Sequence, residues 1–146
     1  MKLRKFGEIK VSEIGLGCWQ LGGDWGDVDD YTAQNVLETA FENKINFYDT
    51  ADVYGSGRSE ELLYKYLKPI APESFIATKL GRFPEPGNSN NYTLESFRRF
   101  TENSLKRLGV DSLDLTQLHC IPTNLIESGK VFEWLRILQN EGKIKQ

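Results

Sequence analysis

The chain has 146 residues, and its 18 basic and 21 acidic side chains give a formal net charge of −3. Apolar residues make up 39% and charged residues 27%, which excludes a disordered chain and predicts one soluble domain over residues 1–146. No apolar run is long enough for a membrane-spanning helix, and no basic cluster indicates nucleic acid as a partner.

The first elements expected along the chain are a hairpin and one strand–helix unit. Residues 2–11 are compatible with a short hairpin that turns at Gly7-Glu8. Residues 14–18 predict a short buried strand, closed by a glycine-rich loop that runs to residue 23. Aspartates at positions 27, 29 and 30 indicate a helix start, because carboxylates complement the helix dipole there. Apolar residues then follow at helical spacing over 33–41.

Three further strand–helix pairs follow. Strands are predicted over residues 46–49, 74–80 and 113–119, and helices over 59–67, 94–108 and about 125–140. Gly109 and Gly142 are the expected stops of the last two helices. Parallel strands need such helical crossovers, so the pattern predicts an α/β protein built from four βα repeats. Residues 81–92 form the one long irregular stretch, and they follow a strand, where α/β folds place substrate loops.

Several kinds of site and compartment are not supported. The basic start Met1–Lys5 leads into no apolar segment, so a secreted protein is not expected and the cytoplasm is the expected compartment. A single histidine, His119, rules out histidine-rich zinc centres, and no metal site is expected. Cys120 is its neighbour, but adjacent strand residues face opposite sides, so no Cys–His nucleophile is expected. Gly15–Gly17 and Gly55–Gly57 match the dinucleotide fingerprint only in part, which does not support a Rossmann domain.

Four polar side chains stand at or just after the predicted strand ends. Asp49 closes the second strand and Tyr54 follows it, Lys79 lies near the end of the third strand, and His119 ends the fourth. Parallel strands place their carboxyl ends on one rim, so we expect the four side chains to meet there. Each side chain alone has a simpler explanation. The aspartate could cap a turn, the tyrosine could be a packing residue, the lysine could extend to solvent and the histidine could be structural. Their shared rim favours a functional site.

The motifs around these residues resemble the aldo-keto reductase family. The run from Phe47 to Glu60, which reads FYDTADVYGSGRSE, resembles the family signature. Gly15–Trp19, Ala77–Lys79 and Gln117–His119 resemble the first-strand, lysine-strand and histidine-strand motifs, and Glu141–Lys145 resembles the stretch before strand five. The resemblance implies NADP(H)-dependent reduction of aldehydes and ketones on a TIM (βα)8 barrel. Such a barrel needs about 250 residues, so the chain resembles a first half of four βα units, truncated before strand five.

The resemblance assigns catalytic roles to Asp49, Tyr54, Lys79 and His119. Tyr54 is the implied acid/base, because hydride transfer leaves charge on the carbonyl oxygen that a positioned acid must neutralise. A tyrosine with its usual pKa of about 10 is a reluctant donor, and an ammonium such as Lys79 lowers that pKa. Asp49 is expected to balance and orient the lysine. His119 is expected to align the carbonyl oxygen or to share in the proton relay.

Residues of the first loop are implied to contact the ligands. The expected cofactor-binding residues are Cys18, Trp19 and Asp49. Cys18 takes a position where the family often has threonine, which weakens any hydrogen bond to the cofactor. The expected pocket for an apolar carbonyl substrate is aromatic, although the two tryptophans could instead only cover the barrel mouth. Its residues are Trp19, Trp25, Tyr54 and His119.

Two hypotheses account for the short chain. In the first, which we favour, it is a reductase sequence cut short, without the family's phosphate-binding loops after strands seven and eight, and it binds NADPH weakly. In the second, it is a catalytically inactive half-barrel that serves as a binding or structural module. Either way, exposed edges on the first and last strands are expected to favour self-association. Apolar helix residues are expected to lie partly uncovered and to add to it, namely Phe132, Leu135 and Leu138.

Overall fold

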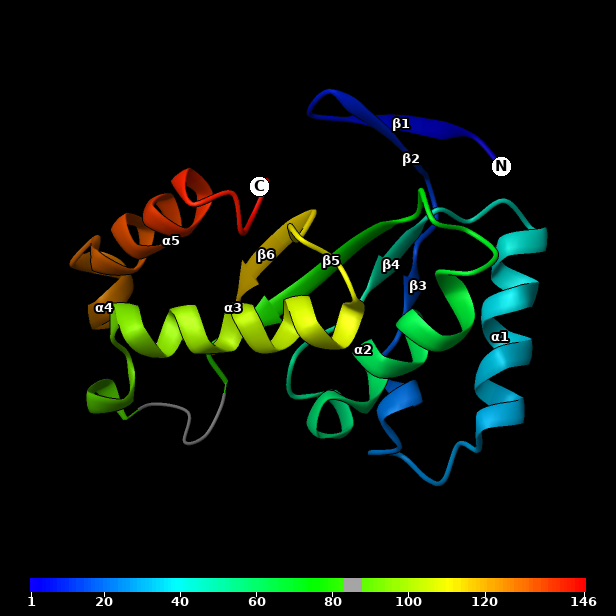
Figure 1. Ribbon diagram of the computed structural model, residues 1–146, viewed down its shortest axis with the longest axis horizontal. Helices are drawn as coiled ribbons and strands as arrows, with labels where there is room; N and C mark the ends of the chain where they lie inside the picture. Colours follow the sequence, from blue (N-terminus) through cyan, green and yellow to red (C-terminus); the bar gives the residue numbers. More distant parts are fainter. Residues whose placement is uncertain (83–87) are drawn as a thin grey trace.

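The computed structural model describes residues 1–82 and 88–146 and contains a hairpin and a parallel sheet (Figure 1). The hairpin pairs β1 (Leu3–Phe6) with β2 (Ile9–Ser12). The parallel sheet has the order β3-β4-β5-β6, so strands that are consecutive along the chain are neighbours in space. Its strands are β3 (Leu16–Gly17), β4 (Phe47–Asp49), β5 (Phe75–Leu80) and β6 (Leu115–Leu118).

Helical segments connect the parallel strands. The longer ones are α1 (Asp30–Glu42), α3 (Leu94–Leu108) and α5 (Lys130–Asn140). Shorter ones are η1 (Gln20–Gly22), η2 (Tyr54–Gly57), α2 (Arg58–Leu62), η3 (Leu63–Leu67), η4 (Ser89–Asn91) and α4 (Thr123–Glu127). This is the α/β fold class that the sequence predicts, with the βα unit that a TIM barrel repeats eight times. The expected irregular stretch 81–92 lies partly outside the described residues.

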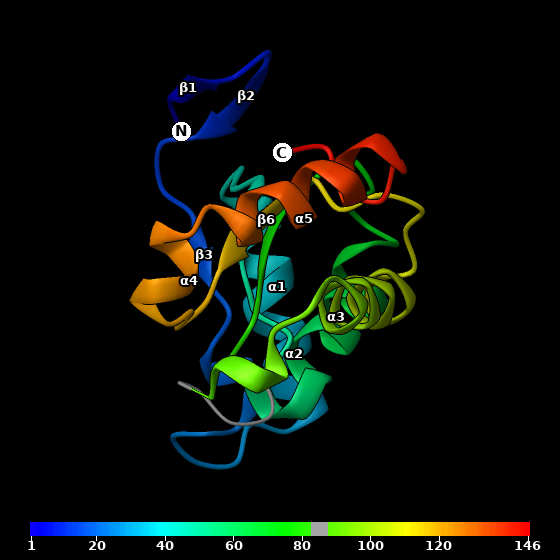
Figure 2. The same ribbon diagram turned by 90° about the vertical axis from the view of Figure 1, so that its left-hand side faces the viewer.

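Two apolar layers sandwich the parallel sheet. The larger layer packs α1, η3 and α3 against one face of the sheet, and Figure 2 shows α1 and α3 on the same side of it. Leu37, Leu63 and Phe97 are fully buried in this layer. The smaller layer lies on the other face, where Phe75 and Ala77 of β5 pack with Val11 of the hairpin. The hairpin lies near the amino ends of the strands, which leaves the carboxyl ends open for a site.

Several predicted boundaries are confirmed, and their caps explain them. The hairpin turns at Gly7-Glu8, because Phe6 pairs with Ile9 and Gly7 adopts a φ of +58°. Asp29 caps α1, where its carboxylate accepts a hydrogen bond of 2.7 Å from the Thr32 amide. Gly109 ends α3 with a left-handed φ of +61°.

Other boundaries differ from the prediction. The single helix expected over 125–140 is wrong: α4 and α5 are separate helices, because Gly129 between them has a φ of +76°. The helix expected over 59–67 is α2, which is continued by the single π turn η3. The predicted strands 14–18 and 113–119 shorten to β3 and β6. Leu138, expected to be uncovered, is fully buried, whereas Phe132 is 41% exposed.

The prediction of a free edge at the last strand is also wrong in part. Residues 143–146 run parallel to the start of β6 and bridge Ile144 to Leu113. The Leu113 amide donates to the Lys143 carbonyl at 2.9 Å, and the Lys145 amide donates to the Leu113 carbonyl at 2.8 Å. Residues 143–146 therefore lie beside the last strand through an isolated parallel bridge. On the opposite side of the sheet, β3 pairs only with β4 within the described residues.

Candidate active site

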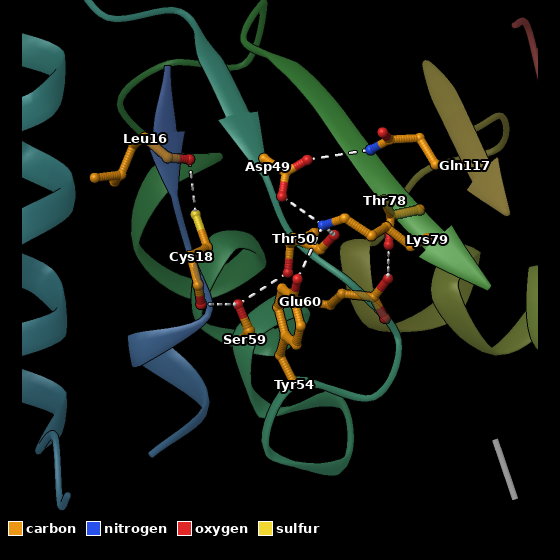
Figure 3. A network of polar contacts seen from close by, with 10 residues as sticks. All are labelled: Leu16, Cys18, Asp49, Thr50, Tyr54, Ser59, Glu60, Thr78, Lys79 and Gln117. Carbon is orange, nitrogen blue, oxygen red and sulfur yellow. Dashed lines mark hydrogen bonds and ion pairs between the residues drawn. The ribbon is translucent and has the colours of Figure 1, made fainter. Parts of the chain in front are cut away.

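Lys79 is the centre of a polar network at the carboxyl end of the sheet (Figure 3). Its ammonium donates to the Asp49 carboxylate, to the Thr50 carbonyl oxygen at 2.7 Å and to the Tyr54 hydroxyl at 3.1 Å. The Lys79 side chain is only 15% exposed, so it does not reach into solvent as the simpler explanation supposed. A partly buried cation with three acceptors is held in one place.

Asp49 accepts one donor on each of its carboxylate oxygens. Oδ1 pairs with Lys79, and Oδ2 accepts a hydrogen bond of 3.1 Å from the Gln117 amide. The carboxylate therefore does not cap the turn that follows β4. Strand register explains the arrangement. Lys79 of β5 lies opposite Gln117 of β6, and Asp49 lies on β4, the neighbour of β5 on its other side.

A tight turn aims Tyr54 back at the lysine. Gly55, Ser56 and Gly57 follow it with φ values of +57°, +56° and +103°. A Cβ atom at Gly55 would lie 2.2 Å from the Gly22 carbonyl oxygen, so only glycine permits this approach of the two loops. The turn brings the Tyr54 ring under the ammonium, with Lys79 Nζ 4.8 Å from the ring centroid.

His119 follows β6 and meets Tyr54 from the side. The two rings are 6.1 Å apart and nearly perpendicular, at 86°. Burial lowers the pKa of His119 below its usual value, and the cations of Lys79 and Arg82 lower it further, against the opposing effect of Asp49. Both effects favour the neutral imidazole. Its Nδ1 is buried without a hydrogen-bond partner among the described residues, so this nitrogen can serve a ligand.

The two tryptophans form an aromatic wall beside Tyr54. The Trp19 ring stacks on the Tyr54 ring at 6.0 Å and contacts the Trp25 ring at 4.5 Å. Trp19 is 37% exposed and Trp25 is 68% exposed, so both rings offer apolar surface at the mouth of the site. Trp19 Nε1 donates to the Asp24 carboxylate at 2.6 Å, which fixes the ring.

Arg58 holds the first loop in place from the start of α2. Its guanidinium donates to the carbonyl oxygens of Leu21 at 2.5 Å and Val28 at 2.7 Å. These two residues flank the segment that carries Trp25. Sequence reasoning did not single out Arg58, although a basic residue directly after a Gly-Ser-Gly turn is a usable signal for a loop anchor.

The two cysteines differ in environment. Cys18 is fully buried, and burial raises the pKa of its thiol to about 12. Its Sγ donates to the Leu16 carbonyl oxygen at 3.5 Å, so the thiol already has a partner within the chain. Cys120 is exposed with a φ of +57°. Neither cysteine forms a disulfide.

An ion pair with a buried carboxylate contacts the lysine strand next to the network. Glu60 is fully buried and accepts hydrogen bonds of 2.6 Å from Arg107 of α3 and 2.6 Å from the Thr78 hydroxyl of β5. Because Thr78 precedes Lys79, this pair ties α2 and α3 to the lysine strand. Gly57 leaves room for it, since a Cβ there would lie 2.6 Å from the Arg107 side chain. Sequence reasoning missed both partners, which are 47 residues apart.

Asp52 is a second buried carboxyl group near the site. It is 3% exposed, and its Oδ1 has no hydrogen-bond partner within the described residues. Burial raises the pKa of Asp52 to about 7, and the nearby Glu60 charge raises it too, against the lowering effects of Arg107 and Lys79. This carboxyl group therefore titrates nearer neutral pH than an exposed aspartate does.

Other kinds of site find no support in the part of the chain that the structure describes. No group of three or more histidine, cysteine or acidic side chains in residues 1–82 and 88–146 is arranged to hold a metal ion. A search of the helices in these same residues finds none with the length and apolar character needed to cross a membrane.

Comparison with known proteins gives a consistent family. The model of the aldo/keto reductase family matches residues 13–146. The Bacillus subtilis oxidoreductase YqkF is 35% identical, over 99% of this chain and 47% of its own length. The solved aldo-keto reductase AKR11C1 from Bacillus halodurans, in its holo form, superposes with a TM-score of 0.82 at 32% identity, covering 99% of this chain and 48% of that one.

A further solved relative carries a nicotinamide cofactor. The aldo-keto reductase from Klebsiella pneumoniae in complex with NADPH has a TM-score of 0.76 at 26% identity, covering 95% of this chain and 45% of that one. The chain thus spans about half the length of the relatives it matches. The family model covers nearly the whole sequence, and the chain belongs to the aldo/keto reductase family.

Proposed function

We propose that this chain carries the catalytic half of an NADP(H)-dependent reductase that converts aldehydes and ketones into alcohols. One observation carries the proposal: the Lys79 ammonium contacts the Tyr54 hydroxyl and the Asp49 carboxylate at the same time. This arrangement couples a proton donor to a fixed cation at the open end of the sheet, as acid catalysis at a carbonyl oxygen requires.

In this proposal Tyr54 donates the proton to the carbonyl oxygen. Its hydroxyl oxygen accepts from Lys79, so its own proton is available for a substrate. Loss of that proton leaves a phenolate, and the adjacent ammonium stabilises the new negative charge. Asp49 balances the lysine charge and keeps the ammonium between the two oxygens.

His119 orients the substrate rather than supplying the proton. Its lowered pKa favours the neutral ring, and the imidazole lies edge-on to the Tyr54 ring, with the two ring centroids 6.1 Å apart. A neutral imidazole can donate one hydrogen bond to a carbonyl oxygen without adding charge. Trp19 and Trp25 supply apolar surface beside that oxygen, which supports an apolar carbonyl substrate.

The residues present fit a nicotinamide cofactor at this end of the sheet. The rings of Trp19 and His119 both lie against the Tyr54 ring, at 6.0 Å and 6.1 Å, and His119 Nδ1 is buried without a partner among the described residues, a grouping that suits a flat ring with a carbonyl beside it. NADP(H), when bound, supplies the hydride. Trp19 and Asp49 would flank the ring, whereas Cys18 is fully buried with its thiol already bonded to Leu16, which argues against a polar contact from that side chain.

We further propose that residues outside these 146 hold the cofactor phosphates. The relatives are about twice as long, and phosphate contacts are charge-assisted bonds of about 1.5–3 kcal/mol each. Without them, affinity falls about tenfold for every 1.4 kcal/mol. The 146-residue chain is therefore expected to bind NADPH very weakly and to self-associate through its β3 edge.

The test compares two forms of the protein with one substitution. The chain is assayed alone and joined to the second half of the Bacillus halodurans relative, with NADPH and a series of aldehydes. We expect activity in the joined form only, and Tyr54→Phe should lower its kcat by about 10²–10⁴-fold. Tyr31→Phe, at an exposed tyrosine on α1, is the matched control and should leave kcat unchanged.

Three results would contradict the proposal. Near-normal turnover by Tyr54→Phe would remove this residue from the acid role. A joined form that folds and binds no NADPH would instead support the binding-module hypothesis. Micromolar NADPH affinity in the 146-residue chain, measured by fluorescence titration, would show that the phosphate contacts lie within it.

A further inference from the structure

We propose that Gln117 is a positioning residue for the catalytic network, which fixes the Asp49 carboxylate and, through it, the Lys79 ammonium. The Gln117 amide donates to Asp49 Oδ2 at 3.1 Å, while Lys79 binds Oδ1 of the same carboxylate (Figure 3). The effect of Gln117 on turnover rests on the proposed function. Its effect on the positions of Asp49 and Lys79 does not.

The bond spans three strands of the sheet. Asp49 is on β4, Lys79 on β5 and Gln117 on β6, directly opposite Lys79 in the strand register. The lysine strand therefore lies between the carboxylate and the amide that restrains it. Asp49 and Gln117 are 68 residues apart in sequence, and their contact depends on the register of all three strands.

The chemistry of each partner makes the contact directional. A carboxylate accepts only, so the Gln117 amide must turn its nitrogen toward Asp49, because its oxygen would be repelled. The amide is neutral and does not compete with Lys79 for the negative charge. A second cation at this position would share the carboxylate and weaken its hold on the lysine. A neutral donor instead restrains the carboxylate and leaves its charge to Lys79.

The expected consequence is a loss of order at the lysine when the donor is removed. Without Gln117, Oδ2 of Asp49 loses the hydrogen bond that restrains it, and the carboxylate can rotate about its Cβ–Cγ bond. Lys79 would then follow Oδ1 away from the Tyr54 hydroxyl, which is its longest contact at 3.1 Å. Gln117 acts through Asp49 and needs no contact with substrate.

The experiment replaces Gln117 with methionine, which keeps the length of the side chain but cannot donate. The control is Thr116→Val on the same strand, because the Thr116 hydroxyl is buried and has no hydrogen-bond partner among the described residues. The first readout is the side-chain ammonium signal of Lys79 in ¹⁵N NMR spectra of the 146-residue chain, assigned by its loss in Lys79→Arg. An ammonium held by three acceptors exchanges its protons slowly with water, which makes it observable.

We expect the Lys79 signal to broaden or vanish in Gln117→Met and to persist in Thr116→Val. In the joined, active form, kcat should fall about tenfold with KM changed less than about twofold, since the lost bond acts on the network and not on substrate binding. An unchanged Lys79 signal in Gln117→Met would overturn the proposal. Equal loss in both variants would also overturn it, because the cause would then be general disturbance of β6.

The two readouts separate this proposal from the proposed function. If the joined form proves inactive with wild-type sequence, the reductase assignment fails, and the NMR comparison still decides whether Gln117 positions Lys79. If the joined form is active and the Lys79 signal is insensitive to Gln117, only the positioning role fails.

Discussion

The Lys79–Asp49 network at the carboxyl end of the sheet and the outer edge of the sheet at β3 differ in how completely their polar groups are paired. At the carboxyl end, Lys79 has three acceptors and both oxygens of Asp49 have donors. At the edge, β3 has two residues and, within the described chain, one neighbouring strand. A groove of about 460 Å³ lies beside it, and its lining includes Leu16, Val36 and Ile45.

The difference depends on where the partners of each region lie in the sequence. The site uses side chains from three adjacent strands and the turn after β4, which the βα units bring together without a closed barrel. The edge of β3 can be satisfied only by a strand from elsewhere. The polar network around Lys79 can thus form while the sheet that carries it is still open.

The largest effect is expected when the support under the site is removed. Glu60→Gln leaves the Arg107 guanidinium, whose side chain is 20% exposed, opposite a neutral amide, and breaking the pair should cost about 3 kcal/mol, the lower end of the range for buried pairs. We expect a loss of that size in the free energy of unfolding, measured by urea titration. The neighbouring Glu61 is exposed, and Glu61→Gln should change the value by less than about 0.5 kcal/mol. Equal effects would show that the pair does not support the fold.

The next largest effect concerns Asp52 and depends on pH. Its folded-state pKa of about 7 lies above the ordinary value of 3.8, so the folded chain holds a proton that the unfolded chain releases. Stability due to this group is present below about pH 4 and is lost as the pH rises toward 7. The free energy of unfolding of Asp52→Asn, relative to that of the wild-type chain, should therefore increase by about 2–3 kcal/mol between about pH 5 and pH 8.

Urea titrations at the two pH values measure this gain. Asp111→Asn, at an exposed aspartate, serves as the control and should show no such dependence. A gain for Asp52→Asn that is equal at both pH values would contradict the raised pKa.

A smaller effect tests the electrostatics of the site itself. His119 is the only histidine of the sequence, so its imidazole signal in an NMR titration is unambiguous. We expect the pKa of His119 to lie below the usual value of 6.5, because the ring is buried and faces two cations. Lys79→Met should raise this pKa by removing one of those cations. A pKa at or above 6.5 in the wild-type chain would contradict the neutral role proposed for His119.

The smallest effect on stability is expected at the edge. Val36 lies in the groove beside β3 and is 38% exposed, so Val36→Lys should change the free energy of unfolding by less than about 0.5 kcal/mol. It should nevertheless reduce self-association, measured as molar mass by light scattering, because a charge in an apolar contact is costly to bury. Tyr31→Lys, on the same helix but outside the groove, should leave self-association unchanged. A wild-type chain that is monomeric at all concentrations would contradict the edge proposal.

Local sequence signals were sufficient to place most elements and the principal polar residues. Helical periodicity, the aspartates at 27, 29 and 30 and the Gly109 stop predicted α1 and α3 closely. Asp49, Tyr54, Lys79 and His119 could be assigned to one rim because each stands at or just after the carboxyl end of a strand in the same parallel repeat. The break at Gly129 could not be found in this way, because the apolar spacing continues across it while the backbone does not.

Which distant groups meet was settled by tertiary packing alone. The Gln117–Asp49 bond and the Glu60–Arg107 pair join residues 68 and 47 positions apart, and the bridge between Ile144 and Leu113 covers part of an edge expected to be free. Each depends on strand register and on helix packing, which are set by the whole core. Periodicity reports which face a residue occupies, but it carries no information about which residue of another element stands opposite.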